Sequence, residues 1–460
     1  MLKVDYEGHL GDKRIEKRGT ELHHRLFSNS TQSIQRLSQT RAEQKAYYRF
    51  LLNEKVSETK LIDEMLARCS RQVKGKVVLS IQDTTEINLT NHRNRLKSET
   101  GLGGIDYSKG IGFKLHPSLV VDASNCFPLG FSSLKMWGRT LEVDDRTDWE
   151  RKKRPLAEKE SNKWIEAGKK SKETLSDAAT IIIIQDREGD IFSQFQQIPD
   201  QQTHLLIRSR FNRNIEGDEQ KLWETLGQSV KLGNHKVRLD SDSHGRTPAR
   251  EADIEVRSTK TSIKAKGKTS IEIYAVEALE IAVGDYEPVH WRLLTTWPVT
   301  TFEDALLMIE WYTWRWFIEE LFRILKKEGF NIEGSELETG WSIRKLTVML
   351  LDTIIKLMQM HIAYNEPEDA NAPEASLLFS EEEQEFITLL NSRMEGKTSA
   401  LKNPFKPGKL NYAVWVLSRI GGWKGYASQR KPGMTIMLNG LKKFYDIHQG
   451  WVLQKDVGTR

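Results

Sequence analysis

The sequence predicts an α/β protein whose strand-rich middle is flanked by helical segments at both ends. Apolar residues recur three and four positions apart between residues 10 and 70, which is typical of amphipathic helices. Short β-branched runs bounded by glycines and turn residues follow between residues 75 and 296. Helical spacing returns at residue 302 and continues, with interruptions, to residue 450. Together these patterns place a sheet between two sets of helices.

Composition limits the class of protein. The chain has 460 residues, of which 38% are hydrophobic and 29% charged, as expected for a globular protein of two to four domains. Its two cysteines, Cys69 and Cys126, are too few for a disulfide framework or a cysteine-based zinc cluster, and they favour a reducing compartment. The charged N-terminus lacks the apolar core of a signal peptide, and no apolar run approaches the ~18 residues of a membrane span. We therefore expect a cytoplasmic protein without a membrane partner.

The charge is unevenly distributed along the chain. The net charge is +5, yet residues 391–460 contain 13 lysines and arginines against 3 acidic residues. The stretch before them, 366–385, is rich in glutamate. A basic tail favours an anionic partner, although a solvated surface that keeps the chain soluble explains the same charges.

The N-terminal helices carry cations beside tyrosines. The segments "IEKRGTELHHRLF" and "AEQKAYYRFLLNEKV" have helical apolar spacing. Four basic residues lie among these helices, close to Tyr47 and Tyr48: Arg36, Arg41, Lys45 and Arg49. A basic helical bundle of this kind is typical of a DNA-reading domain, and the alternative is an N-terminal cap on the next domain.

The middle of the chain alternates strands with turns. "GKVVLSIQDTTEINL" predicts a buried strand that ends near Asp83, and "ATIIIIQDREGDIF" predicts the most apolar strand, with Asp186 at its polar end. The other expected elements are two strands around the turn 122–125, a helix at 190–198, a strand at 204–210 and antiparallel strands throughout 230–296. Further helices are expected from 302 past 328, from 341 to 364 and across 380–450, with a linker marked by Pro367 and Pro373.

Asp83 and Asp186 each directly follow an apolar strand. Carboxylates at the ends of neighbouring strands can approach closely while the apolar residues stay in the core, and such a pair repels itself unless a cation neutralises it. Mg²⁺ is the usual partner, since it takes carboxylate oxygens and keeps water positions free for a phosphate. The alternative for either residue alone is ordinary turn chemistry at a strand end.

One expected helix, "EWYTWRWFIEELFRILKKEGF" (310–330), carries an unusual polar stripe. At about 100° per residue, four residues share one narrow face of a continuous helix, and Trp316 and Arg323 flank it: Tyr312, Arg315, Glu319 and Lys326. Such a stripe is a poor core but a good phosphodiester site, because its cations and phenol bind phosphate oxygens and Glu319 supplies a third carboxylate. Three carboxylates around two metal ions are the usual apparatus of in-line phosphoryl transfer. The alternative is a surface stripe joined by salt bridges one turn apart.

In its motifs the chain resembles a known family. The spacing Tyr312-x2-Arg315-x3-Glu319-x6-Lys326 matches the Tyr-Arg-Glu-Lys signature of DDE insertion-sequence transposases in the IS-four group. "QDTTEINL" and "DREGDIF" resemble the segments that hold the family's first and second aspartates. "LGDKR" (10–14) is similar to the start of its N-terminal DNA-binding domain, and "RIGGWKGY" (419–426) to the start of its C-terminal region. The likeness spans nearly the whole chain in the family's order.

The resemblance implies an RNase H-like catalytic core with an inserted antiparallel β subdomain, flanked by helical domains. Asp83, Asp186 and Glu319 would be the catalytic residues and would bind two Mg²⁺ ions per active site, with Mn²⁺ as a substitute. The implied domains are a helical DNA-binding domain at 1–70, the catalytic domain at 71–365 with its β insertion at 211–300, and a helical C-terminal domain for dimerisation and end pairing at 366–460.

The resemblance also assigns DNA contacts. Tyr312, Arg315 and Lys326 would hold the phosphates of the transposon end, and Arg208 in "IRSR" matches a family arginine near the active site. Trp291 would fill the space left by a flipped base, where aromatic contacts offset the lost stacking, and the alternative for Trp291 is a core position in an alternating strand. The other expected DNA-contacting residues are Arg210, Trp316 and Arg323.

The implied function is cut-and-paste DNA transposition. A homodimer would bind double-stranded DNA at the inverted repeats of both transposon ends, nick it, cut the second strand through a hairpin formed by 3′-hydroxyl attack, and join the ends to target DNA. The hairpin step rests on the resemblance alone. The alternatives are an RNase H-like nuclease without strand transfer, a non-catalytic or inhibitory DNA-binding regulator and a two-carboxylate glycosidase, which the Arg/Lys stripe fits badly.

Overall fold

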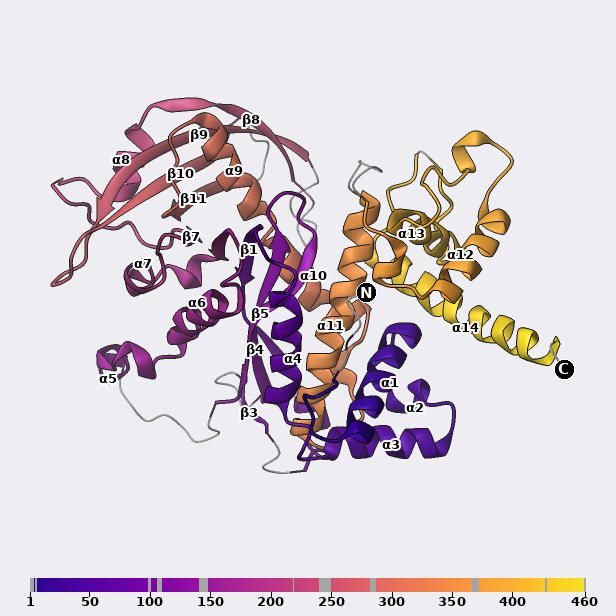
Figure 1. Cartoon of the computed structure of the whole chain (residues 1–460). Helices are drawn as coiled ribbons and strands as arrows, with labels where there is room; N and C mark the ends of the chain where they lie inside the picture. The colour runs from indigo at the N-terminus through magenta and orange to yellow at the C-terminus, as the bar shows by residue number, and fades with distance from the viewer. Residues whose placement is uncertain are drawn as a thin grey trace.

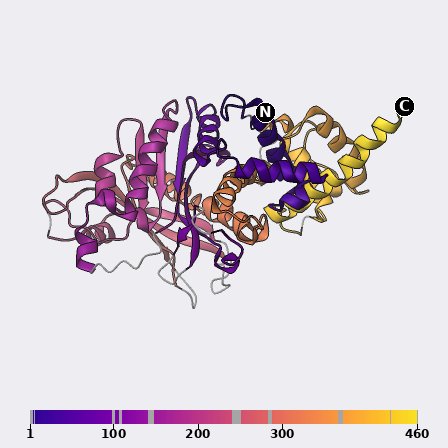
Figure 2. The ribbon, with the colours of Figure 1, turned by 90° about the horizontal axis from the view of Figure 1, so that it is seen from below.

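The chain folds around a large mixed sheet with helices at both ends, as Figure 1 shows. This computed structural model describes residues 4, 6–97, 101–105, 110–139, 148–217, 219–239, 250–281, 287–365, 372–426 and 428–458. The expected α/β class, with helices flanking a strand-rich middle, is confirmed. Figure 2 shows that the strand-rich part and the C-terminal helices lie at opposite ends of an elongated molecule.

The centre of the sheet has the strand order β5-β4-β1-β6-β7. These strands are β1 (Val77–Gln82), β4 (Ile111–Asp122), β5 (Pro128–Trp137), β6 (Thr180–Gln185) and β7 (Thr203–Arg208). β4 pairs antiparallel with β1 and β5, whereas β6 lies parallel to both β1 and β7. β1 and β6 are buried along nearly their whole length, which explains why their sequences are continuously apolar instead of alternating. Two short strands also pair with β4: β2 (Thr85–Asn88) and β3 (Gly103–Gly104).

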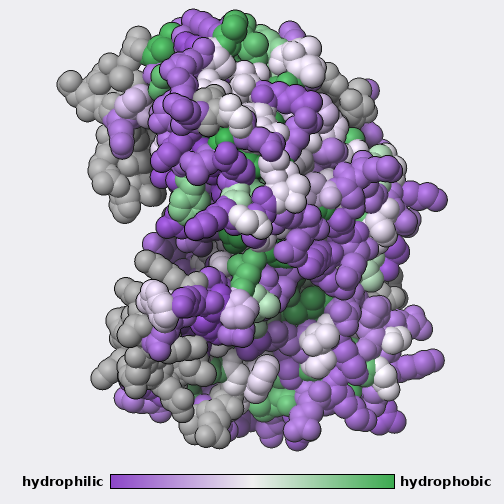
Figure 3. All heavy atoms as spheres, turned by 90° about the vertical axis from the view of Figure 1, so that its left-hand side faces the viewer, coloured by the Kyte–Doolittle hydropathy of each residue, from purple (hydrophilic) through white to green (hydrophobic). Residues whose placement is uncertain are grey.

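The antiparallel strands expected in 230–296 are present, but they do not form a separate sheet. They are β8 (Lys231–Leu239), β9 (Arg250–Ile263), β10 (Ile271–Ile281) and β11 (His290–Thr295). β11 pairs antiparallel with β7, with Leu293 opposite Arg208, so the insertion extends the central sheet edge to edge. This arrangement is compatible with the expected antiparallel β insertion, and β11 pairs with backbone groups of β7 that would otherwise be exposed at the edge of the sheet. The face of the molecule at the left of Figure 1 is mainly hydrophilic, as Figure 3 shows.

Helices form in the N-terminal and C-terminal segments and near residue 192, as the sequence predicts, whereas the helices at 148–153, 163–174 and 222–228 were not predicted. The N-terminal helices are α1 (Lys13–Asn29), α2 (Ile34–Leu37), α3 (Arg41–Leu52) and α4 (Glu58–Ser70). The helices beside the sheet are α5 (Asp148–Lys153), α6 (Lys163–Thr174), α7 (Phe192–Gln197) and α8 (Leu222–Gln228). The C-terminal helices are α12 (Glu381–Met394), α13 (Leu410–Ile420) and α14 (Met434–Gly458). Pro367 of the expected linker lies outside the described residues.

The helix expected to run unbroken from 302 past 328 is interrupted, so this expectation is wrong in part. α9 (Phe302–Thr313) begins with a capping box between Thr301 and Asp304, and α10 (Trp316–Arg323) continues into a π-helical turn at Ile324–Glu328. Between α9 and α10 the backbone hydrogen bonds change from the α-helical i→i−4 spacing to i→i−3, as in the bond from Arg315 N–H to Tyr312 O. A tighter turn followed by a wider one shifts every later residue around the axis, so a constant 100° per residue does not describe this segment.

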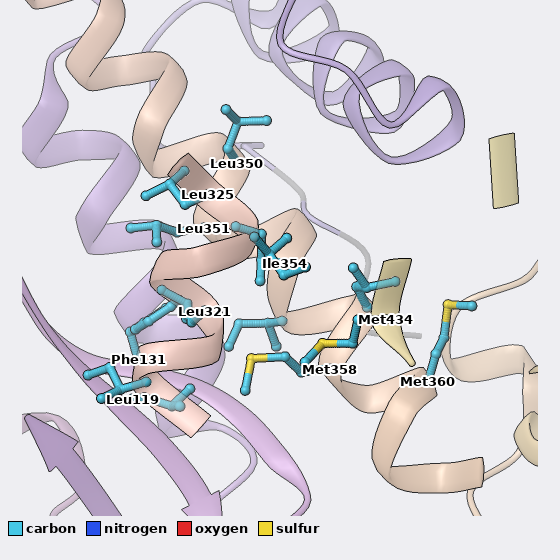
Figure 4. Close-up of a cluster of buried hydrophobic side chains, with 14 of the residues drawn as sticks. Leu119, Phe131, Leu321, Leu325, Leu350, Leu351, Ile354, Met358, Met360 and Met434 are labelled. Atoms are coloured by element: carbon cyan, nitrogen blue, oxygen red, sulfur yellow. The ribbon is translucent and has the colours of Figure 1, made fainter. Parts of the chain in front are cut away.

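The apolar helix α11 (Gly340–Asn365) is the centre of the core. It packs against β5, α10 and the N- and C-terminal helices, and its leucines and methionines meet Leu119, Phe131, Leu321 and Met434 (Figure 4). Among the described helices, α11 alone has the length and apolar composition of a membrane span, and 89% of its apolar window is buried by the other elements. Burial of that extent identifies α11 as the core helix.

Buried charges join α11 to the N-terminal helices. Arg68 on α4 donates to Asp352 Oδ1 on α11 at 2.6 Å and to both oxygens of Glu64 at 3.1 Å. His23 on α1 places Nε2 2.6 Å from Asp352 Oδ2. Burial alone would raise the pKa of Asp352, but Arg68 and then His23 hold it well below its usual value. Asp352 therefore carries a buried charge on α11 that pairs with Arg68 of α4 and lies beside His23 of α1.

Asp352→Asn should destabilise the protein strongly, because Arg68 would lose one of its two buried carboxylate partners. We expect a loss of about 3–5 kcal/mol in the free energy of unfolding, measured by denaturant titration. The control is Glu272→Gln, which removes an exposed cross-strand ion pair with Lys260 and should cost less than about 1 kcal/mol. Equal losses from the two variants would contradict the assignment of Asp352 as a structural charge.

Candidate active site

Asp83 and Asp186 follow directly on two neighbouring parallel strands. β1 and β6 pair in register up to Ile81 opposite Ile184, so continuing the register by two residues sets Asp83 beside Asp186. Ile81 and Ile184 belong to the core that also contains residues of α10 and α11. Because side chains alternate between the two faces of a sheet, residues two positions further on share that face. Both aspartates therefore emerge on the side of the sheet that α10 and α11 cover.

Glu319 on α10 meets the aspartates through Arg315. The Arg315 guanidinium donates from Nη1 to Asp83 Oδ2 at 3.0 Å and from Nη2 to Glu319 Oε1. Burial raises the pKa of Asp83 to about 6; Arg315 opposes this rise, whereas the charges of Asp186 and Glu319 add to it. The structure thus brings the three predicted acidic residues to one end of the sheet, and their catalytic role stays a prediction.

The donor set has the chemistry of a site for a hard divalent cation. All three side chains offer carboxylate oxygens, and a cation would offset the burial and repulsion that destabilise the Asp83 charge. In the part of the chain that the structure describes, no three acidic, histidine or cysteine side chains already converge on one point. In this structure the Glu319 carboxylate is paired with Arg315. Asp83 and Asp186 fit a cation as a pair, and Glu319 would join them when Arg315 turns to another anion.

Aromatic rings and a second arginine line the same end of the sheet. Tyr312, at the end of α9, is buried, and its ring packs edge-on against Trp291 of β11 with 5.8 Å between centroids. Burial raises the pKa of Tyr312, so its phenol stays protonated at neutral pH and can donate a hydrogen bond. Burial lowers the pKa of Arg208 on β7 and the neighbouring Tyr312 raises it, while Arg208 Nη2 donates to His290 O at 3.3 Å. The half-buried Trp291 is thus both a packed residue and a neighbour of the predicted phosphate-binding phenol.

The other residues of the predicted stripe differ in their surroundings. Lys326 lies in the π-helical turn with Nζ 3.5 Å from Thr85 Oγ1, two residues beyond Asp83 along the chain. The Trp316 side chain is 51% exposed, which leaves its ring accessible to a ligand. Arg323 instead donates to Glu320 Oε2 at 2.7 Å within its own helix. Lys326 Nζ also lies 3.7 Å from Glu333 Oε1, so Lys326, like Arg323, has an acidic neighbour, but only Lys326 lies beside β2.

Asp190 is a residue beside the site that sequence reasoning did not single out. Its buried carboxylate accepts hydrogen bonds from the backbone N–H of Arg210 at 2.8 Å and of Phe211 at 3.1 Å, and it pairs with the guanidinium of Arg213. These bonds fix the segment after β7, which carries the exposed side chain of the predicted DNA contact Arg210. The signal in the sequence is the second aspartate of "DREGD", four residues after Asp186.

Lys163, the first residue of α6, is a further side chain near the acidic site. Its side chain is 8% exposed, and Nζ lies 3.6 Å from Glu188 Oε2 and 5.4 Å from the centre of the Trp164 ring. Burial lowers the pKa of Lys163, and the charges of Glu188 and Asp83 are among those that raise it again. A buried ammonium close to the acidic end of β1 is a candidate phosphate contact, and nothing in its sequence position distinguishes it from the other lysines of α6.

The N-terminal helices present cations on one face. Arg41, Lys45 and Arg49 recur every four residues along α3, so they lie on one side of the helix, and all three are exposed. Tyr47 does not join them, because it is fully buried and donates from its hydroxyl to Glu43 Oε1 at 2.7 Å. The basic face of α3 is therefore available to an anionic partner, while Tyr47 belongs to the core.

Comparison with known protein families gives an independent reading of these helices. Residues 7–56, which include α1, α2 and α3, match the family of transposase DNA-binding domains. The match lies in the N-terminal part of the chain and leaves the acidic end of the sheet outside it. The chain thus carries a transposase DNA-binding domain at its N-terminus, which supports a DNA-binding, DNA-processing transposase.

Proposed function

We propose that the protein is a cut-and-paste DNA transposase that binds the terminal inverted repeats of a mobile element, cleaves both strands at the ends and joins them to target DNA. The observation that supports the proposal is that Asp83, Asp186 and the Arg315–Glu319 pair lie at one end of the sheet in a chain with a transposase DNA-binding domain. An acidic site alone is compatible with many phosphoryl-transfer enzymes. The DNA-binding domain indicates that the substrate is DNA.

The catalytic core is inferred to be RNase H-like and of the DDE type. The order β5-β4-β1-β6-β7, with three antiparallel strands followed by two parallel ones, supports this inference. The position of the acids supports it too, because Asp83 directly follows the first of these five strands along the chain and Asp186 directly follows the fourth. The Tyr-Arg-Glu-Lys spacing favours the IS-four group within that type.

The side chains around the site have distinct roles in this proposal. Asp83, Asp186 and Glu319 would hold two Mg²⁺ ions, which when bound activate the attacking oxygen and stabilise the leaving oxygen of an in-line displacement. Arg315 presents a two-pronged guanidinium that suits a phosphate as well as a carboxylate, so it can pass from Glu319 and Asp83 to the DNA backbone. The Tyr312 phenol donates to a phosphate oxygen in the same place.

Second-strand cleavage would use the freed 3′-hydroxyl and form a hairpin that water then opens. A hairpin bends the strand sharply and unstacks a base, and Trp291 offers an aromatic ring next to Tyr312 where that base can stack. The basic face of α3 would contact the phosphates of the terminal repeat. The C-terminal helices would pair two copies in the cytoplasm, and α14 exposes Ile447 and Leu453 for such a contact.

Glu319→Gln should abolish cleavage and leave binding of the terminal-repeat DNA unchanged, because the amide keeps the shape but loses the charge that a metal site needs. We expect nicking in Mg²⁺ to fall by more than about 100-fold, the upper range for lost support of a metal site. The measurement is a nicking assay and a gel-shift assay on DNA that carries the repeats flanking the gene. Glu310→Gln, an exposed carboxylate on α9, is the matched control and should nick normally. Retained Mg²⁺-dependent nicking by Glu319→Gln would refute the role given to the triad.

Lys45→Ala and Arg49→Ala should each weaken binding of the repeat DNA and lower its salt dependence. Each lost phosphate contact is expected to reduce the slope of log K against log salt by about 0.9. Titrations at several salt concentrations measure this, with Lys170→Ala on α6 as a control outside the DNA-binding domain. A slope unchanged in both α3 variants would place the DNA on another surface.

Strand transfer separates a transposase from a nuclease with the same core. Pre-cut transposon ends with a free 3′-hydroxyl, incubated with supercoiled target DNA and Mg²⁺, should yield products in which end and target are joined. A nuclease would leave the ends unjoined while still cutting DNA. A regulator without catalytic activity would bind the ends and give neither cleavage nor joining.

A further inference from the structure

Each predicted catalytic aspartate is preceded by a glutamine. Gln82 and Gln185 are the last residues of β1 and β6, the two strands that lie side by side in parallel, and Asp83 and Asp186 directly follow them. Gln82 and Gln185 are fully buried. Since successive residues of a strand point to opposite faces, the glutamines lie on the side of the sheet away from α10 and Glu319. A buried polar pair therefore sits directly behind the acidic pair.

The glutamines form a continuous chain of side-chain amides with Gln194 of α7. Gln185 Nε2 donates to Gln82 Oε1 at 2.8 Å and to Gln194 Oε1 at 3.0 Å. Gln194 Nε2 returns a bond to Gln185 Oε1 at 2.7 Å and donates to the backbone carbonyl of Gly189 at 2.5 Å. All three side chains are fully buried, where such bonds are stronger than in water.

The amide chain holds the turn that carries Asp186. Asp186 accepts a hydrogen bond from the backbone N–H of Glu188 at 2.8 Å, so the direction of its carboxylate depends on the backbone at 187–189. That backbone lies directly on the amide chain: a Cβ added at Gly189 would be 2.3 Å from Gln185 Oε1. Because the other end of the chain bonds Gln82, the turn after β6 is tied to the residue before Asp83.

Stability alone explains the amide chain poorly. Gln82 Nε2 is buried and has no hydrogen-bond partner among the described residues, and a buried donor without a partner destabilises the fold. An apolar side chain of the same length would fill this position without that cost. The placement of the glutamine beside Asp83 accounts for its presence, since Gln82 Oε1 anchors the amide of Gln185.

We propose that Gln82, Gln185 and Gln194 are positioning residues that set the separation and direction of the Asp83 and Asp186 carboxylates, and through them the affinity of the site for its divalent cation. The proposal rests on the proposed function for the identity of the site. In other metal sites, residues that hydrogen-bond behind the metal ligands orient those ligands. Loss of such a residue lowers metal affinity by about 10–100-fold, and we assign this role to the three glutamines.

The test measures metal binding directly on the full chain without DNA. Mn²⁺ is titrated into wild type, Gln82→Met, Gln185→Met and the double variant, and free Mn²⁺ is followed by electron paramagnetic resonance. We expect each single variant to bind Mn²⁺ about 10-fold or more weakly and the double variant to be little worse than Gln185→Met, because one chain is broken in each case. In nicking assays the variants should need more Mg²⁺ for half-maximal rate and should recover at high Mg²⁺.

Ser80→Ala is the matched control. Ser80 is fully buried, lies on the same face of β1 two residues before Gln82, and shares hydrogen bonds with Ser132 and Ser171 at 3.0 Å and 3.1 Å. It should lower the midpoint of thermal unfolding while leaving Mn²⁺ affinity unchanged. Gln82→Met should show the reverse, a near-normal midpoint with weakened Mn²⁺ binding.

The two proposals fail in different ways. Folded glutamine variants with wild-type Mn²⁺ affinity, or an equal loss of affinity in Ser80→Ala, would overturn the positioning role. Wild-type protein that shows no saturable Mn²⁺ binding would overturn it as well. Wild-type protein that binds Mn²⁺ with the expected dependence on the glutamines, yet neither cuts nor joins transposon ends, would uphold the positioning role and refute the transposase function.

Discussion

The parallel pairing of β1 and β6 is the constraint on which the rest of the site depends. Two strands in register deliver Asp83 and Asp186 to the same height on the same face, so the closeness of the carboxylates follows from backbone hydrogen bonds. Burial, and to a smaller extent the neighbouring charge of Asp186, raises the pKa of Asp83. The positive charge of Arg315, which lies between α9 and α10 on the helical layer, offsets the charge of Asp83 by donating a hydrogen bond to it.

The segment 310–330 combines charge and aromatic bulk because it serves the core and the site at once. Trp311, Ile318 and Leu321 are buried and hold α9 and α10 against the sheet and α11. Arg315 lies between the two helices, where the tightened backbone turns its side chain toward Asp83. The change from α-helix to a tight turn and then to a π-helical turn is the kind of irregularity that often accompanies functional sites.

Sequence patterns predict the strands and the acidic pair well, since both depend on local apolar runs and on where those runs end. They predict the residues near the acidic site only in part. Of the helical stripe, the structure places Arg315 against Asp83 and Lys326 beside Thr85. The stripe assumes a continuous helix that the structure does not have, and it does not indicate that Arg323 bonds to Glu320. Asp190 and Lys163 escape sequence reasoning because their partners are distant in the sequence: the segment after β7 binds Asp190, and Glu188 lies beside Lys163.

The position of the DNA-binding helices relative to the acidic site is set by α11. Lys345 of α11 donates to the carbonyls of Leu51 and Asn53, both at 2.9 Å, and so closes the C-terminal end of α3. Arg344 pairs with Glu58 at the start of α4, and Asp352 pairs with Arg68 in the last turn of the same helix. Pulling the N-terminal helices away from α11 would leave these buried groups without partners, which costs far more than bending a flexible linker. In the transposase proposed above, the distance between α1–α3 and the acidic end of the sheet would therefore be set by the packing of both on α11 and not by a flexible linker.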